Sequence, residues 1–199
     1  MTCPGKAVIE SRHEPFNGVN VGVEKMRDRL KPIIGGVHWY GNNVDTDVII
    51  PGKYMTSTRL EDLLPHTMEG IDPAFPKRVR PGDLIVAGTN FGCGSSRETA
   101  ATLIRASGIE AVIAESFSRI FYRNAINMGL LVVECPGISK AVTSGDKLRY
   151  DPSSGLVENL TRPWVGQGTV VPEFLMQILA QGGIIEAYKN RIRGQSEDT

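Results

Sequence analysis

The chain has 199 residues, 41% of them hydrophobic and 22% charged, which is typical of a globular protein large enough to bury a core. Its 22 basic and 22 acidic residues balance, so no overall positive field favours nucleic acid, and no apolar run approaches the roughly 20 residues of a membrane span. The three widely spaced cysteines (Cys3, Cys93 and Cys135) exclude a disulfide framework and a self-sufficient metal or iron–sulfur site, and they indicate a reducing, cytoplasmic location.

Residues 1–32 are interpreted as an N-terminal extension, and residues 33–199 as the domain that carries the function. The extension lacks the basic start and the apolar core of a secretion signal. It is also acidic for an organelle transit peptide, because it carries three glutamates and one aspartate between residues 10 and 28. The N-terminal sequence is therefore in keeping with a cytoplasmic protein.

The elements expected before residue 84 are short and broken by glycine and proline, the residues that mark turns. Apolar stretches alternate with such residues at first, which predicts strands, and one helical pattern is interrupted by Pro65. The expected elements are a strand at 33–34, a turn at Gly35-Gly36, a short strand at 37–40, an apolar run at 48–50, a helix over 59–69 and a turn at 81–83.

The segment 84–135 is the most regular part of the chain. Buried apolar runs alternate there with helical patterns, and each helix ends at a glycine. A strand–helix–strand–helix–strand order with short connections indicates parallel strands joined by right-handed crossovers. The fold class is therefore α/β with a mainly parallel central sheet, and the expected elements are strands over 84–87, 111–114 and 130–133 and helices over 97–107 and 117–128.

Beyond Pro136 the pattern changes. Strand-like runs flank Asp151–Gly155, which predicts a β-hairpin with an oversized turn. Pro172 then opens a C-terminal helix, and the pair Gly182-Gly183 predicts a kink or break before the helix continues toward Arg193.

The loop GTNFGCGSSRETA at 88–100 carries the clearest chemical signal, because it leaves a buried strand and enters a helix. Open α/β sheets place ligands at such loops, and the first N–H groups of a helix lack intrahelical partners and attract anions. Glycine allows close approach of the backbone, serine offers a hydroxyl, and arginine offers a planar fork that matches a carboxylate or phosphate. One interpretation is therefore an anion site with a reactive hydroxyl beside it, formed by Gly92, Gly94, Ser95, Ser96 and Arg97.

A second interpretation is structural, and the residues alone leave it open. Ser95 followed three residues later by Glu98 fits a capping box, in which the serine merely starts a helix. Nucleotide signatures do not fit, because the loop lacks the Walker A spacing and the third glycine of a dinucleotide site. A serine–histidine triad is not indicated either, since His13, His38 and His66 lie outside the regular α/β part.

Three long motifs follow one another in unbroken order: GNNVDTDVIIPGKYM at Gly41–Met55, VAGTNFGCGSSRE at Val86–Glu98 and AVIAESFSRIFYRNAINMGLLVVEC at Ala111–Cys135. They resemble the small, swivelling-domain subunits of the aconitase superfamily, most of all those of isopropylmalate isomerase (3-isopropylmalate dehydratase) and homoaconitase. The likeness covers about residues 33–190. It implies a single swivelling β/β/α domain.

In that family a [4Fe–4S] cluster in a separate large subunit acts as a Lewis acid, and water is removed and added back with the hydroxyl moved. The resemblance implies that this chain holds no cofactor of its own and acts with an iron–sulfur large subunit, as a heterodimer or heterotetramer, on a di- or tricarboxylate. The most similar activity interconverts 2-isopropylmalate and 3-isopropylmalate in leucine biosynthesis.

The resemblance also assigns roles to residues of the loop at 88–100. The family's proton-transferring serine matches Ser95, whose ionised form Ser96 and Arg97 are expected to stabilise. Arg97 in addition resembles a clamp for a substrate carboxylate, and Gly94 allows the backbone to approach the substrate. Thr99 stands where relatives commonly have histidine, and we interpret it as a support of the loop.

In relatives, the residues just after the tyrosine-containing turn help to select the substrate. An apolar residue there suits an isopropyl group, and an arginine suits a chain that bears a carboxylate. This chain has Met55, Thr56 and Ser57 at the matching point, with Arg59 close by, so the resemblance leaves the exact substrate open. Dehydratases of the homoaconitase, dimethylmalate or methylmalate type are alternatives.

Two functions of other classes are weighed beside the dehydratase. A stand-alone module would use the same helix start to hold a phosphate or carboxylate effector. A regulatory or RNA-binding role is disfavoured by the balanced charge.

Three further features receive mainly structural interpretations. The run Asp45–Asp47 is expected to bond to nearby backbone N–H groups at a strand end. Arg119 and Arg123 are expected at the surface or at a subunit interface. Cys93 is interpreted as a packing residue of the loop, because no second cysteine is near it in the sequence.

Overall fold

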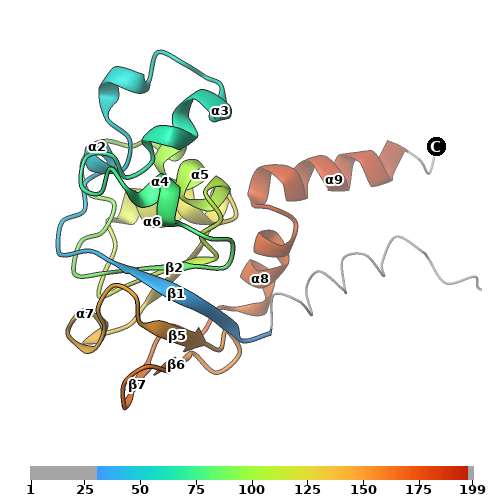
Figure 1. The fold of residues 1–199 in the computed structure, drawn as a ribbon. Coiled ribbons are helices and arrows are strands. Elements are labelled where there is room, and N and C mark those ends of the chain that lie inside the picture. Colours follow the sequence, from blue (N-terminus) through green and yellow to red (C-terminus); the bar gives the residue numbers. More distant parts are fainter. Residues whose placement is uncertain (1–30, 197–199) are drawn as a thin grey trace, which may run out of the picture.

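The computed structural model of the chain describes residues 31–196, so nearly all of the extension expected over 1–32 lies outside the described residues. Within the described range, seven strands form one sheet in the order β4-β3-β2-β1-β5-β6-β7 (Figure 1). The strands are β1 (Ile33–Trp39), β2 (Leu84–Ala87), β3 (Ala111–Ala114), β4 (Leu131–Glu134), β5 (Lys147–Tyr150), β6 (Leu156–Asn159) and β7 (Trp164–Gln167).

One half of the sheet is parallel and contains β1 to β4. Strands β2 and β3 are buried along their whole length, in agreement with their continuous apolar sequences. The parallel strands predicted at 84–87, 111–114 and 130–133 are therefore confirmed as neighbours. The other half is antiparallel: it contains the predicted hairpin, β5 and β6, and also β7, which was not predicted from the sequence.

Strand β1 joins the two halves, pairing with β5 through Ile33–Gly36 and with β2 through Val37–Trp39. The turn expected at Gly35-Gly36 is therefore wrong. A Cβ atom on Gly35 would lie 2.1 Å from the carbonyl oxygen of Gly82, so glycine is required there by the close approach of the turn that precedes β2. The glycines serve packing rather than chain reversal.

Different helices cover the two faces of the sheet. On one face lie α5 (Glu98–Ala106) and α6 (Arg119–Asn127), which end before Gly108 and Gly129, both with positive φ, as predicted. On the other face lie α7 (Ile138–Ala141) and α8 (Glu173–Ala180). The predicted break at Gly182-Gly183 separates α8 from α9 (Ile184–Ser196), which extends away from the sheet (Figure 1). None of the helices within residues 31–196 is long and apolar enough to cross a membrane.

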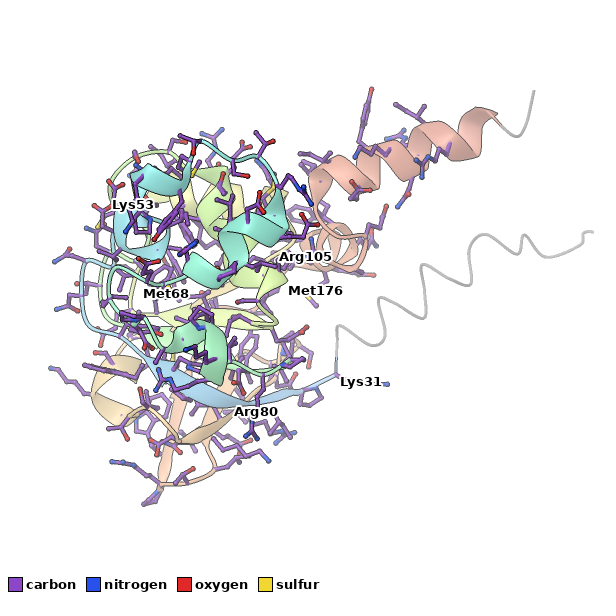
Figure 2. The ribbon with its side chains drawn as sticks, turned by 45° about the horizontal axis from the view of Figure 1, so that its top comes forward. Lys31, Lys53, Met68, Arg80, Arg105 and Met176 are labelled. Carbon is purple, nitrogen blue, oxygen red and sulfur yellow. The ribbon has the colours of Figure 1, made fainter. Side chains whose placement is uncertain are left out.

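A cap of short helices lies over the α5 and α6 face, beyond the C-terminal end of β1 (Figure 1). Met68, labelled in Figure 2, is fully buried with the cap's other apolar side chains. Val48 and Ile49 of the apolar run at 48–50 lie in a helix, and Ile50 follows it. The helix predicted over 59–69 is present only in part, as a short α-helix and a 3₁₀ turn that contains Pro65. The cap consists of α2 (Thr46–Ile49), η1 (Gly52–Tyr54), α3 (Leu60–Leu63), η2 (Leu64–His66) and α4 (Phe75–Arg78).

Candidate functional site

The loop at 88–97 leaves β2 at the carboxyl end of the parallel strands, where open α/β sheets bind ligands. Backbone hydrogen bonds join this loop to residues 44–46, the segment that leads into α2. The N–H of Gly92 donates to the carbonyl of Val44 at 2.7 Å, and the N–H of Thr46 donates to the carbonyl of Cys93 at 2.9 Å. The loop and α2 therefore form one connected unit.

Helix α5 begins at Glu98, and its N-cap position is Arg97, whose side chain caps nothing. Ser95 lies two residues before that position, so the capping box expected from Ser95 and Glu98 does not form. The exposed hydroxyl of Ser95 has one weak neighbour, the hydroxyl of Thr46 at 3.5 Å, while its carbonyl accepts a hydrogen bond from that hydroxyl at 3.0 Å. The backbone of Ser95 is held, and its hydroxyl is available to a ligand.

The guanidinium of Arg97 points toward α2 and is mostly buried, with 19% of the side chain exposed. Its Nη1 donates to the carbonyl of Ile50 at 2.9 Å and pairs with the carboxylate of Asp47. Its Nη2 faces Gly52, where an added Cβ atom would lie 3.5 Å away. An arginine has five N–H donors, so these contacts orient the fork and leave donors for an anion.

Two glycines let the loop pack against its surroundings, and each has a positive φ. A Cβ atom on Gly92 would lie 2.1 Å from the ring of Phe121, and one on Gly94 would lie 2.4 Å from the carboxylate of Asp45. Asp45 in turn caps α2, because its carboxylate accepts the N–H of Asp47 at 2.7 Å. The structural interpretation of Asp45 is confirmed, although the residue begins a helix rather than ending a strand.

Cys93 is partly buried in the loop and its backbone pairs with that of Asp45. Burial, and then the negative charge of Asp45, raise the pKa of the Cys93 thiol, so the thiol stays protonated at neutral pH. Over residues 31–196 no three His, Cys, Asp or Glu side chains are grouped so that they could hold a metal ion. These features agree with a packing role for Cys93.

The residues expected to select the substrate follow η1. Met55, Thr56 and Arg59 are exposed, while the hydroxyl of Ser57 donates to Asp62 at 2.8 Å and accepts the N–H of Arg59 at 3.2 Å. This segment begins three residues after Gly52, one of the residues that face Arg97. The structure thus holds Ser95 and Arg97 against α2 and its C-terminal end, and the segment Met55–Ser57, expected to select the substrate, follows η1 at the surface of the cap.

Sequence reasoning missed the residues that orient the site. The carbonyl of Ile50 and the carboxylate of Asp47 fix Arg97, and the hydroxyl of Thr46 fixes Ser95. These partners lie about 50 positions away in the chain and carry no pairing signal of their own. The Asp-Thr-Asp run was the one hint, because it concentrates polar groups ahead of an apolar run.

Comparison with known proteins supports the resemblance read from the motifs. Residues 42–137 match the aconitase C-terminal domain. The isopropylmalate/citramalate isomerase small subunit of Methanocaldococcus jannaschii is 51% identical over 164 residues, which are 82% of this chain and 98% of that protein. The 3-isopropylmalate dehydratase small subunit of Ruminiclostridium cellulolyticum is 49% identical over 79% of this chain and 97% of its own length.

A solved structure agrees. The crystal structure of 3-isopropylmalate dehydratase (leuD) from M. jannaschii superposes with a TM-score of 0.78 at 43% identity, covering 85% of this chain and all of that one. The resemblance and the α/β fold class are confirmed. The chain therefore belongs to the aconitase C-terminal domain family, among the small subunits of 3-isopropylmalate dehydratases.

Proposed function

We propose that this chain is the small subunit of a cytoplasmic hydro-lyase that interconverts positional isomers of a substituted malate, with residues 33–199 as its swivelling domain. The proposed substrate pair is 2-isopropylmalate and 3-isopropylmalate, because relatives about half identical to this chain have isopropylmalate in their names. A smaller, citramalate-like malate is the second candidate, since one of these relatives is named an isopropylmalate/citramalate isomerase small subunit.

One observation carries the proposal: an exposed serine and an oriented arginine lie two positions apart in a loop that leads into a helix without a side-chain cap. Ser95 is proposed to take the proton from the carbon that loses it, and Arg97 to hold a substrate carboxylate. A serine alone is a weak base, so its ionised form needs positive charge and N–H donors nearby. Arg97, Ser96 and the first N–H groups of α5 are proposed to supply them.

The [4Fe–4S] cluster of the proposed large subunit would supply Lewis-acid chemistry at the substrate hydroxyl when bound. Such a cluster needs about three or four cysteine thiolates brought together. Cys93 and Cys135 are separate free thiols, and burial raises the pKa of Cys135 to about 11, so the described part of the chain does not offer that ligand set. The partner is therefore proposed to hold the cluster, while this chain orients the substrate and moves the proton.

The test is reconstitution with the cluster-bearing large subunit from the same genome, under anaerobic conditions. The mixture is expected to interconvert the two isopropylmalates and to exchange the substrate's carbon-bound proton with solvent deuterium. Each subunit alone is the control and should do neither. A mixture with intact cluster that acts on none of a panel of 2- and 3-substituted malates would contradict the proposal. Anion binding by the chain alone would then favour the stand-alone module.

A further inference from the structure

The cap contains a polar cluster that the proposed chemistry does not use. The carboxylate of Glu69 accepts three hydrogen bonds: from the phenol of Tyr54 at 2.8 Å, from Nζ of Lys53 at 3.2 Å and from Nδ1 of His66 at 2.5 Å. The rings of Tyr54 and His66 are stacked, with centroids 3.6 Å apart and planes 13° apart. Nζ of Lys53 also lies 4.6 Å from the centroid of the Tyr54 ring. Glu69 therefore ties η1 to the turn that follows η2.

That turn is itself fixed to the rest of the site. The N–H of Met68 donates to the carbonyl of Ile49 at 2.7 Å, and the N–H of Gly70 donates to the carbonyl of Val48 at 3.0 Å. The side chain of Met68 is fully buried, whereas Lys53 lies at the outer side of the cap (Figure 2). Because Glu69 stands between two residues bonded to α2, its backbone has little freedom. Helix α2 in turn holds Ser95 and Arg97.

The segment after Tyr54 has few other supports. The N–H of Ser57 donates to the carbonyl of Tyr54 at 3.2 Å, and the hydroxyl of Ser57 donates to Asp62. Met55 and Thr56 are exposed. The start of this segment is consequently positioned by whatever holds Tyr54, while its end is held by Ser57.

An isolated surface ion pair contributes little to stability, and the pair of Lys53 with Glu69 alone would be of that kind. The cluster differs, because one carboxylate receives three donors and two of those donors are stacked on each other. Hydrogen bonds to a charged group are also stronger than neutral ones. The phenol of Tyr54 and Nδ1 of His66 donate to Glu69, so these two groups are bonded to that carboxylate rather than to the substrate site.

We propose that Glu69 is a positioning residue for substrate selection: by holding Lys53, Tyr54 and His66 together, it fixes the segment Met55–Ser57 relative to Ser95 and Arg97. This inference rests on the proposed function for the role of that segment. The cluster of Glu69 with Lys53, Tyr54 and His66 is a property of the isolated chain and does not depend on the proposed function.

The first test therefore needs no activity. In Glu69→Gln the shape is kept, but an N–H replaces one of the two accepting oxygens. Hydrogen exchange of the full chain is expected to become about tenfold faster at the amides of 53–57 than in the wild type, since hydrogen bonds to charge are lost. The matched control is Glu158→Gln on β6, whose side chain is also 29% exposed and pairs with Arg149 at 2.7 Å. It should leave exchange at 53–57 unchanged.

The second test uses the reconstituted enzyme and two substrates, isopropylmalate and citramalate. Glu69→Gln is expected to raise KM for the preferred substrate and to change the ratio of the two kcat/KM values about fivefold, with kcat nearly unchanged. Tyr54→Phe, which keeps the ring stack and loses the phenol, should change the ratio in the same direction by less.

The outcomes separate the two proposals. Unchanged hydrogen exchange at 53–57 in Glu69→Gln would show that Glu69 does not hold this segment, whether or not the enzyme is active. Faster exchange with an unchanged substrate ratio overturns the selective role. An inactive wild-type complex contradicts the proposed function and leaves the exchange result standing.

Discussion

Ser95 and Arg97, the two residues proposed to act on the substrate, differ in how firmly their side chains are held. The Ser95 hydroxyl is exposed beside a held backbone, whereas the Arg97 guanidinium is oriented by α2. A base must reach the substrate proton, and a clamp must have its direction set before the substrate arrives. The difference in their surroundings therefore matches the two roles proposed for them.

Ser95→Ala tests the base directly. In the reconstituted complex, kcat is expected to fall by about 10²–10⁴-fold, because the group that takes the proton is gone while Arg97 still binds the carboxylate. Ser96→Ala is the neighbouring control, with a smaller loss expected. Thermal melts of both variants should match the wild type, since Ser95 does not cap α5. Near-normal kcat in Ser95→Ala would refute the assignment.

At the scale of elements, the candidate site depends on two segments whose contact leaves no room for a side chain at one position. The loop at 88–97 and α2 meet where Gly94 faces Asp45. This contact explains a glycine in the middle of a functional loop, because both the positive φ and the space are needed.

Gly94→Ala is expected to destabilise the protein by more than the ordinary cost of a positive φ. Its Cβ would lie 2.4 Å from the Asp45 carboxylate, whereas a Cβ on Gly137, which has a similar φ, meets nothing within 4 Å. Gly137→Ala should cost about 1 kcal/mol of unfolding free energy, and Gly94→Ala about 2 kcal/mol or more. Denaturant melts of the two variants measure the difference. Equal losses would mean that the loop moves aside without cost.

The Glu69 cluster predicts a specific dependence of stability on pH. Hydrogen bonds from His66, from Tyr54 and then from Lys53 lower the pKa of the Glu69 carboxyl from its ordinary value of 4.5 to about 2. A lowered pKa means that the folded state prefers the ionised form, so the stabilisation is complete above pH 4.5 and is lost as the pH falls toward 2.

The expected result is a lower melting temperature in Glu69→Gln at neutral pH and a shallower fall of melting temperature between pH 4.5 and 2. Glu158→Gln again serves as the control. Parallel curves for wild type and Glu69→Gln over that range would show that the carboxylate is not held in this way.

At the scale of the whole molecule, the chain is proposed to supply one part of a site that the large subunit completes. Ser95 and Arg97 lie in the loop that follows β2, at the carboxyl ends of the parallel strands, and the segment Met55–Ser57, proposed to select the substrate, lies at the surface of the cap. The remaining walls are proposed to come from the large subunit, so substrate choice is a property of the complex.

Thr56→Arg tests the position of the selecting segment in that complex. An arginine there is expected to shift preference from isopropylmalate toward a malate with an additional carboxylate, because a paired charge is favoured and an unpaired one is penalised on desolvation. The ratio of kcat/KM values for the two substrates is the measurement. An unchanged ratio would move the selecting role to Arg59.

The sequence by itself determined the elements whose causes are local. The alternation of strands and helices over 84–135, the hairpin around Asp151–Gly155 and the break at Gly182-Gly183 follow from apolar periodicity, proline and glycine within a few residues. The motifs also located Ser95 and Arg97 and the family. Each of these signals is complete within a short window of the chain.

Only the tertiary structure decided how the candidate site is arranged. It placed Gly35-Gly36 inside a strand and Val48-Ile49 inside a helix, and it gave Arg97 its partner Ile50, which is 47 positions away. The cluster around Glu69 likewise joins residues whose meeting no periodicity predicts. The physical reason is that these features depend on contacts between distant segments, and local preference is decided there by the space and the hydrogen-bond partners that the other segment provides.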